Sequence, residues 1–355
     1  MLLQGIFPPI TTPFYPQGNV YFKKLESNVD RYSKTPVAGI VALGSNGEAI
    51  LLSDMERRDV LQSVREAAAP NKVLIAGTAT ESADGTLQLT EYAAKLGYDM
   101  AMVRTPHYYK AQMLPANILA FYRFVADRSP LPVLLYNIPQ TTSYDMPVEL
   151  VAELAEHPNI VGIKESGGDV EKVRRMVEAT RHIARSATVT ETFQAVTPRM
   201  LQAASEGRRE LVSIAVPAER PQTATPSSSA VIVTGGLKTR PKEVGFQVMV
   251  GAAHKLEPSL QRGAAGAILG FANIAPTACY EIYAAWKEGD HDLARLKQER
   301  IAKAAVRIVG DLGVAGVKYA MDYNGYFGGT VRLPLLPVTA DDKAEIEALL
   351  SDIRN

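Results

Sequence analysis

AGIVALGS, at residues 38–45, is a short apolar stretch that ends in small polar residues, and similar stretches recur along the chain. The others are KVLIAGT (72–78), DMAMVRTP (99–106), PVLLYNI (132–138) and IVGIKES (160–166). Their starting points lie 34, 27, 33 and 28 positions apart, which is the length of one strand followed by one helix. Continuous rather than alternating hydrophobicity is typical of parallel strands covered on both faces. The repeat therefore predicts an α/β protein with a parallel barrel or a doubly wound sheet.

Three further stretches bring the number of expected strands to eight. They are GIFPPITT (5–12), FQVMVGA (246–252) and GAILGFA (266–272). Eight parallel strands favour a closed (β/α)8 TIM barrel, which we expect over residues 1–275. Helical patterns without intervening strands follow at 276–287, 291–309, 314–323 and 339–353, so residues 276–355 are predicted to form a C-terminal helical extension.

One interval is too long for the repeat. The strands expected at 160 and 246 start 86 positions apart, and roughly 60 of these residues exceed a single repeat. We place an insert at about 184–244, where PAERPQTATPSSS (217–229) has the composition of a loop or a disordered segment. A helix-to-strand connection lies at the base of a barrel, away from the catalytic loops.

The origin of the insert is open. Residues 188–216 weakly resemble the strand and helix that follow the insert, and we favour chance over a degenerate partial repeat. An error of gene prediction would also explain the segment.

Composition narrows the class of partner. The 355 residues include 38 Lys and Arg and 38 Asp and Glu, so the formal net charge is zero. Binding to nucleic acid or to an acidic membrane needs excess positive charge, which makes a small-molecule partner the better expectation. The single cysteine, Cys279, allows no internal disulfide, and the five histidines lack the spacing of metal ligands. We therefore expect no bound metal. MLLQGIFPPI (1–10) is unlike a signal sequence, so we expect a cytoplasmic protein.

Catalytic groups of such barrels lie where strands end, and IVGIKES ends in a lysine. Alternation along this strand puts Ile160, Gly162, Lys164 and Ser166 on the inner face, and Val161 and Ile163 on the outer face. An amine in an apolar barrel mouth loses hydration of its charged form, and the neutral amine is a nucleophile toward carbonyl carbon. The alternative is a structural salt bridge from Lys164 to Glu165 or Glu48.

Two other strand ends carry polar groups. Ser45 and Asn46 lie on a turn flanked by glycines, and they could bind a carboxylate or simply direct the chain into its next helix. Tyr136 is expected to face inward, where it could move a proton or remain a core tyrosine.

Three motifs carry a resemblance to a known family. GSNGE (44–48), YNIP (136–139) and GIKESGGD (162–169) resemble the signature segments of the pyruvate-dependent class I lyases related to dihydrodipicolinate synthase and N-acetylneuraminate lyase. The resemblance covers nearly the whole chain apart from the insert. Within that family the chain is most similar to the 4-hydroxy-2-oxoglutarate aldolases. That similarity rests on AMVRTPHYYK (101–110), HPNIVGIKESGGDV (157–170), MDYNGYFGG (321–329) and RLPL (332–335).

The resemblance implies roles for individual residues. It implies a Schiff base on Lys164, a proton relay through Tyr136 and binding of the substrate carboxylate at Ser45 and Asn46. Ser166 and Gly251 are expected near the substrate, and Tyr108 is expected to reach across a subunit contact. That last role is the weakest, because His107 departs from the common tyrosine and Tyr109 offers another alignment. The family further implies a homo-oligomer, a tetramer, and covalent catalysis without a cofactor.

One departure bears on the substrate. The synthase branch carries an arginine two residues after the proline of its YNxP segment, whereas this chain has Gln140, Thr141 and Thr142 there. The bidentate grip on a second carboxylate is therefore missing. We predict cleavage of 4-hydroxy-2-oxoglutarate to pyruvate and glyoxylate. Dihydrodipicolinate synthase activity is the alternative enzyme, and an inactive barrel that binds 2-oxo acids or serves as a scaffold is the alternative of another class.

Overall fold

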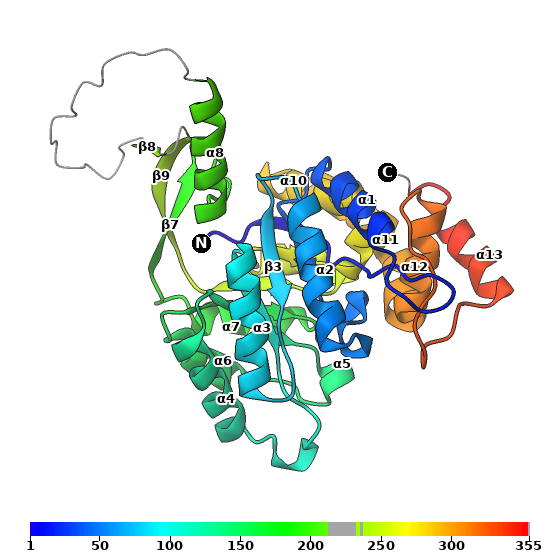
Figure 1. Ribbon diagram of the computed structural model, residues 1–355, viewed down its shortest axis with the longest axis horizontal. Helices are drawn as coiled ribbons and strands as arrows, with labels where there is room; N and C mark the ends of the chain where they lie inside the picture. The colour runs from blue at the N-terminus through cyan, green and yellow to red at the C-terminus, as the bar shows by residue number, and fades with distance from the viewer. Residues whose placement is uncertain (212–231, 235–236, 354–355) are drawn as a thin grey trace, which may run out of the picture.

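A computed structural model describes residues 1–211, 232–234 and 237–353 of the chain. Within these residues eight parallel strands form one sheet in the order β1-β11-β10-β6-β5-β4-β3-β2. Helices lie around the strands (Figure 1). The sheet closes between β1 and β2, because Ala38 donates a backbone hydrogen bond to Ile6 and Val41 donates one to Pro8. The predicted (β/α)8 TIM barrel is confirmed. Its strands are β1 (Gly5–Phe7), β2 (Gly39–Ala42), β3 (Val73–Gly77), β4 (Met100–Arg104), β5 (Val133–Asn137), β6 (Ile160–Glu165), β10 (Gln247–Val250) and β11 (Gly266–Ile268).

Helices cover the outside of the barrel and begin and end at recognisable signals. In α2, Ser53 and Glu56 form a reciprocal capping box, and α3 ends at Gly97, whose φ of 86° is in the left-handed region. The covering helices are α1 (Phe22–Ser33), α2 (Asp54–Ala67), α3 (Ala83–Leu96), α4 (Pro115–Arg128), α6 (Val148–Ala155), α7 (Val170–Ala179), α9 (Leu256–Gln261) and α10 (Pro276–Lys287). The short helix α5 (Pro139–Thr142) lies in the loop after β5.

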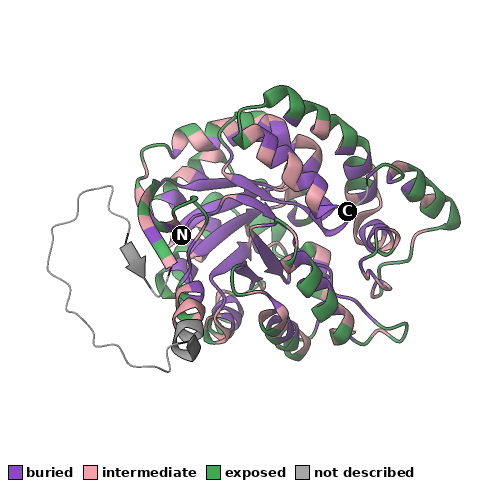
Figure 2. Ribbon diagram, turned by 90° about the horizontal axis from the view of Figure 1, so that it is seen from above, coloured by how far each residue is buried: buried purple, intermediate pink, exposed green. Residues whose placement is uncertain are grey.

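The strands are buried on both faces, as their continuous hydrophobicity predicts (Figure 2). One group of side chains fills the barrel interior, and it includes Phe7, Val41, Ile75, Met102, Leu134, Tyr136, Met249 and Ile268. The alternate residues of the same strands pack outward against the helices. Side-chain facing therefore follows the two-residue period of a strand, which decides which polar groups reach the barrel mouth.

The expected facing along β6 is wrong at its beginning. Val133 of β5 pairs with Ile160, but the next residue, Leu134, pairs with Gly162, so β6 contains one extra residue at this point. Val161 consequently joins the interior group, while Ile160 packs outward. A bulge of this kind reverses the facing of residues on one side of it only. Beyond it, Gly162 and Lys164 face inward and Ile163 faces outward, as predicted.

The insert forms a small antiparallel unit between α7 and β10. It contains β7 (Arg185–Thr190), α8 (Pro198–Leu211), β8 (Ile232–Thr234) and β9 (Leu237–Val244), and its sheet has the order β7-β9-β8. None of its three described strands belongs to the barrel, whose seventh strand along the chain is β10, within the expected 246–252. The segment 217–229, expected to be a loop or disordered, lies outside the described residues.

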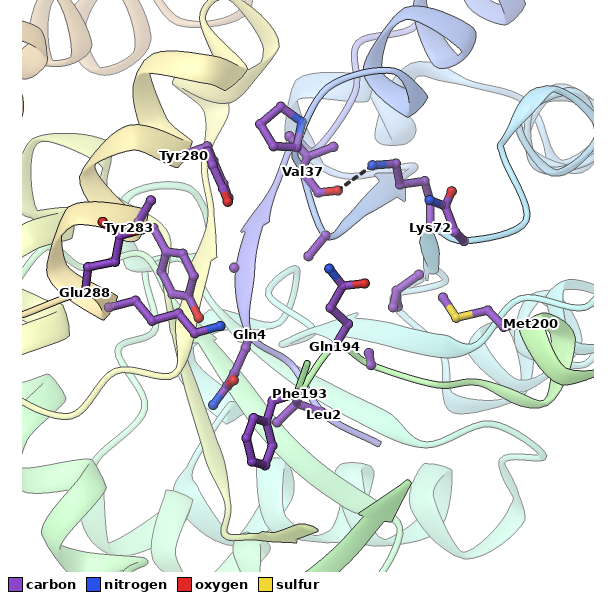
Figure 3. A pocket seen from close by; sticks show the side chains of 18 residues that line it. Leu2, Gln4, Val37, Lys72, Phe193, Gln194, Met200, Tyr280, Tyr283 and Glu288 are labelled. Carbon is purple, nitrogen blue, oxygen red and sulfur yellow. Dashed lines mark hydrogen bonds between the residues drawn. The ribbon is translucent and has the colours of Figure 1, made fainter. Parts of the chain in front are cut away.

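The insert packs against the base of the barrel. Arg199 of α8 donates a hydrogen bond to the carbonyl of Lys72, just before β3, and lies 3.5 Å from the carboxylate of Asp99, just before β4. Met200 joins the side chains of the barrel interior. A pocket of about 510 Å³ lies next to Met200 (Figure 3). The residues that line it include Leu2, Lys72, Phe193, Met200 and Tyr283. The insert therefore lies at the opposite end of the barrel from the carboxyl ends of the strands.

The C-terminal region is helical, with α11 (His291–Ala304), a π-helical continuation (Ala305–Asp311), α12 (Gly313–Tyr323) and α13 (Ala340–Leu349). α10 follows the last barrel strand and packs against β1 and α9. α10 also packs against α11, and the boundary between barrel and extension expected at residue 276 stays a prediction. No helix in the described part of the chain is long and apolar enough to cross a membrane.

Candidate active site

Three inward-facing side chains lie at one level on neighbouring strands of the barrel. Arg104, the last residue of β4, pairs in register with Tyr136 of β5, and Tyr136 pairs in register with Lys164 of β6. Neighbouring strands lie about 4.8 Å apart, so these side chains share one wall of the barrel mouth. The sequence predicted Lys164 and Tyr136 as site residues, whereas Arg104 was not among them.

Lys164 is buried against an aromatic ring. The residue is only 4% exposed, and its Nζ lies 4.1 Å from the centroid of the Tyr136 ring. The two carboxylates considered for a structural salt bridge are paired elsewhere, since Glu165 lies 3.5 Å from Lys172 and Glu48 lies 2.5 Å from Lys318. Within the described residues Lys164 has no ion pair. The salt-bridge alternative is therefore wrong, and the amine is free of a fixed countercharge.

Tyr136 connects this lysine to the loop after β2. Its hydroxyl lies 3.3 Å from the hydroxyl of Ser45, although the tyrosine ring itself is buried. A core tyrosine would place its hydroxyl on a buried backbone acceptor, whereas Ser45 lies exposed at the barrel mouth. The pair of hydroxyl groups can pass a proton between the lysine side of Tyr136 and the open pocket.

The turn after β2 is held in a fixed shape. Residues Ser45–Gly47 form a single 3-10 turn, and the side chain of Thr12 donates a hydrogen bond of 2.7 Å to the carbonyl of Gly47. The Asn46 side chain is half-buried and lies close to Gly270, in the loop after β11. The side chains of Ser45 and Asn46 therefore project from a turn that is held in place. Their backbone N–H groups lie at the beginning of this turn, a geometry that is suited to binding an anion.

Ser166 and Gly251 meet across the ends of β6 and β10. The backbone N–H of Gly251 donates a hydrogen bond of 2.7 Å to Glu165, which brings the two strand ends together. A Cβ atom on Gly251 would lie 1.9 Å from Oγ of Ser166, so only glycine leaves room for this serine. The structure thus brings these two expected substrate-binding residues into one place beside Lys164.

Tyr108 does not join these groups within one chain. It is 75% exposed and packs edge-on against Tyr109, with ring centroids 5.2 Å apart. Its expected role across a subunit contact needs a second copy of the chain and stays a prediction.

A pocket of about 340 Å³ opens above Tyr136. Pro334 and Leu335 of the C-terminal region cover one side. The polar residues that line it are Ser45, Glu48, Arg104, His107, Tyr136 and Thr141. Sequence reasoning missed Arg104 and His107. The period of β4 could have identified Arg104, because Met100 and Met102 share its face and point into the barrel.

Glu48 ties the turn after β2 to the C-terminal helices. Both Glu48 and Lys318 of α12 are buried, and the Lys318 amine also donates hydrogen bonds to the carbonyls of Thr12 and Thr330. Burial lowers the pKa of Lys318 to about 8, although the charge of Glu48 acts in the opposite direction. A cation with these partners holds Glu48, and with it the turn at Ser45 and Asn46, against α12.

Comparison with known proteins finds relatives over nearly the whole chain. A profile of the Dihydrodipicolinate synthetase family matches residues 2–215 and 237–353. L-threo-3-deoxy-hexylosonate aldolase of Hypocrea jecorina is 30% identical over 357 residues, which is 99% of this chain and 95% of that protein. A 4-hydroxy-tetrahydrodipicolinate synthase of Exiguobacterium sp. is 27% identical over 345 residues, which is 97% of this chain and 96% of that protein.

A solved structure is similar in fold as well as in sequence. The chloride-inhibited dihydrodipicolinate synthase of Acinetobacter baumannii, complexed with pyruvate, superposes with a TM-score of 0.77 at 26% identity. The superposition covers 99% of this chain and 98% of the other. These three relatives are not named 4-hydroxy-2-oxoglutarate aldolases, so they do not support the narrower resemblance. The family acts without a cofactor, through a Schiff base on a lysine. The chain belongs to the Dihydrodipicolinate synthetase family of class I pyruvate-dependent aldolases and lyases.

Proposed function

We propose that the protein cleaves 4-hydroxy-2-oxoglutarate to pyruvate and glyoxylate through a Schiff base on Lys164. The neutral Nζ attacks the C2 carbonyl, and loss of water leaves an iminium. The C4 hydroxyl then gives up its proton, the C3–C4 bond breaks, and its electron pair moves into the iminium to form an enamine while the aldehyde leaves. Protonation at C3 and hydrolysis release pyruvate and free the lysine.

The observation that carries the proposal is the contact between Lys164 and Tyr136. The lysine is buried and has no ion pair among the described residues, and the hydroxyl of its aromatic neighbour lies 3.3 Å from Ser45 at the pocket. Tyr136 is therefore placed to move protons to and from the carbinolamine and the C4 oxygen. The turn at Ser45 and Asn46, together with Ser166, supplies hydrogen-bond donors for the C1 carboxylate. Tyr108 from a second subunit would complete the pocket in the proposed homo-oligomer.

The choice of aldehyde rests on the second half of the pocket. The segment after β5 offers Thr141 rather than an arginine, and Thr141 donates its hydroxyl to the carbonyl of Ile138. The grip on aspartate semialdehyde proposed for the synthase branch is thus absent at this position. The fungal relative's name supports a second candidate, a six-carbon 3-deoxy-2-oxo acid whose cleavage would leave a three-carbon hydroxyaldehyde.

A substrate comparison tests this choice. We expect kcat/KM for cleavage of 4-hydroxy-2-oxoglutarate to exceed kcat/KM for condensation of pyruvate with aspartate semialdehyde, because Thr141 provides no bidentate cation at the position where the synthase branch grips the carboxylate of the semialdehyde. The cleavage reaction is measured by the pyruvate that it forms and the condensation by the pyruvate that it consumes. Cleavage of L-threo-3-deoxy-hexulosonate is measured in the same way as a third reaction. A larger value for the semialdehyde, or for the six-carbon acid, replaces the proposed substrate. A protein that uses none of the three but still binds pyruvate would support the scaffold alternative.

The relay role of Tyr136 gives a separate prediction. We expect Tyr136→Phe to retain pyruvate binding but to slow iminium formation by about 10²- to 10⁴-fold, the range typical of a lost general acid–base group. The phenyl ring keeps the contact with Lys164 and removes only the hydroxyl next to Ser45. Single-turnover trapping of the pyruvate adduct measures the rate. Tyr144→Phe is the control, because that tyrosine lies outside the pocket, and wild-type rates in Tyr136→Phe would contradict the relay.

A further inference from the structure

Arg104 lies on the same wall as the lysine and the tyrosine but one strand farther along. It pairs in register with Tyr136 and lines the pocket together with Ser45 and Thr141. Its side chain is only 12% exposed, so most of the guanidinium stem is enclosed. The guanidinium group of an enclosed arginine at the carboxyl end of a barrel strand is less hydrated than one in water. Its interaction with an anion is therefore stronger.

Glu81, in the loop between β3 and α3, holds this arginine in place. Nη1 of Arg104 lies 3.2 Å from Oε1 of Glu81 and also donates to the carbonyl of Thr105. Oε2 of Glu81 accepts hydrogen bonds of 2.8 and 3.0 Å from the backbone N–H groups of His107 and Tyr108. One carboxylate thereby fixes both Arg104 and the loop that follows β4.

The charged groups of this corner are the guanidinium of Arg104 and the carboxylate of Glu81. Burial alone would raise the pKa of Glu81, but the backbone donors of His107 and Tyr108 and the charge of Arg104 outweigh it and leave the pKa below its usual value. Burial, followed by the charge of Arg104, lowers the pKa of His107. The imidazole is therefore neutral at pH 7, and the positive charge of this corner is that of Arg104.

Part of the guanidinium remains available. The hydrogen bonds that Arg104 makes within the described residues all use Nη1. Nε and Nη2 form one of the two edges with which a guanidinium grips a carboxylate bidentately. Glu81 occupies the other side of the group, so the arrangement is a cation oriented by one carboxylate with a second carboxylate position open.

We infer that Arg104 determines specificity by binding the carboxylate of the aldehyde half of the substrate. The inference rests on the proposed function and deepens it, since it assigns to the end of β4 the anion contact that Thr141 cannot make. From β6 to β5 to β4, the three side chains follow the order of the substrate atoms. Lys164 binds C2, Tyr136 exchanges a proton with the C4 oxygen, and Arg104 binds the carboxylate beyond C4. The structure thus favours aldehydes that carry a carboxylate, such as glyoxylate, over neutral hydroxyaldehydes.

Condensation kinetics with paired aldehydes test this inference. Pyruvate is combined with glyoxylate or succinic semialdehyde as anionic acceptors and with glyceraldehyde as a neutral acceptor, in wild type, Arg104→Met and Arg104→Lys. We expect Arg104→Met to lower kcat/KM for the anionic acceptors by about 10- to 100-fold, mainly through KM, the size of effect typical of a lost hydrogen bond to a charged group. Glyceraldehyde kinetics and the KM for pyruvate should change less than about threefold, and Arg104→Lys should restore part of the loss because it retains the charge.

A surface variant that also loses one arginine serves as the control. It separates the effect of losing the charge at the pocket from the effect of changing the net charge of the protein. Arg123→Met removes an arginine of α4 that is half exposed and paired with Glu153, and it should leave every acceptor unaffected. Equal losses for anionic and neutral acceptors in Arg104→Met would show a merely structural role and overturn the inference, as would no loss at all.

The same panel distinguishes failure of the inference from failure of the proposed function. If glyoxylate is used but Arg104→Met leaves its KM unchanged, the inference falls and the function stands. If wild type rejects glyoxylate but uses succinic semialdehyde in a manner that depends on Arg104, the inference stands and glyoxylate is replaced. If wild type accepts only neutral acceptors, both fall.

Discussion

We expect the Lys164→Ala variant to lose turnover by at least about 10⁴-fold, the scale on which removal of a covalent nucleophile acts. Without the amine there is no iminium to accept the electron pair of the C3–C4 bond. Incubation of wild type with pyruvate and borohydride should leave a stable adduct on the peptide that contains Lys164, since reduction converts the iminium to a secondary amine. Intact-mass and peptide mass measurements should show this adduct in wild type and its absence in the variant.

The structure supplies a control for this experiment. Lys110 lies exposed in the loop after β4, and Lys110→Ala should keep both turnover and the adduct. Lys164 has no ion pair within the described chain, so its replacement breaks none, and urea denaturation of the variant checks that it is folded. An adduct on a different peptide, or a Lys164→Ala protein that still turns over, would refute the assignment of Lys164.

The Glu48→Gln variant should be destabilised by about 3–5 kcal/mol, the cost typical of removing one partner of a buried ion pair. Lys318 would remain enclosed by the carbonyls of Thr12 and Thr330 with its charge no longer balanced. Since the turn at Ser45 loses its tie to α12, activity should also fall. Urea denaturation at pH 7 measures the free energy of unfolding.

The pH dependence of that loss gives a sharper test. In the folded wild type the pKa of Lys318 is about 8, below the ordinary value of 10.5. Between these two values the unfolded chain binds more protons than the folded chain, so this residue makes stability rise with pH across that interval. Loss of Glu48 lowers the folded pKa further, which makes the destabilisation largest below about pH 8 and smaller near pH 10.

A second variant keeps the interpretation clear. Glu48→Gln combined with Lys318→Met replaces the unbalanced cation by an apolar side chain of similar length, and it should recover part of the lost stability. A cost below about 1 kcal/mol for Glu48→Gln alone, or a double variant that is less stable than the sum of the single changes, would contradict the pairing.

The inward placement of Lys164 and Tyr136 at the barrel mouth could be predicted because both residues obey local rules. Both lie near the carboxyl end of a barrel strand, and the two-residue period of a strand is sufficient to point them inward. The same rule applied to β4 would have selected Arg104, which follows Met100 and Met102 on the inner face. The rule failed at Ile160 and Val161, because the bulge in β6 depends on how β5 pairs with it and leaves no mark in the local pattern.

By itself the sequence determined the class of fold, the order of the eight barrel strands and the positions of Lys164, Tyr136, Ser45 and Asn46, because strand length, apolar continuity and side-chain period are properties of short segments. Only the tertiary structure decided what depends on segments far apart in the chain. It paired Glu48 with Lys318 across 270 positions, placed Glu81 beside Arg104, and brought Arg199 and Met200 of the insert to the barrel base. Such contacts are set by the closure of the barrel and by the packing of the helices around it, so no single stretch of sequence contains them.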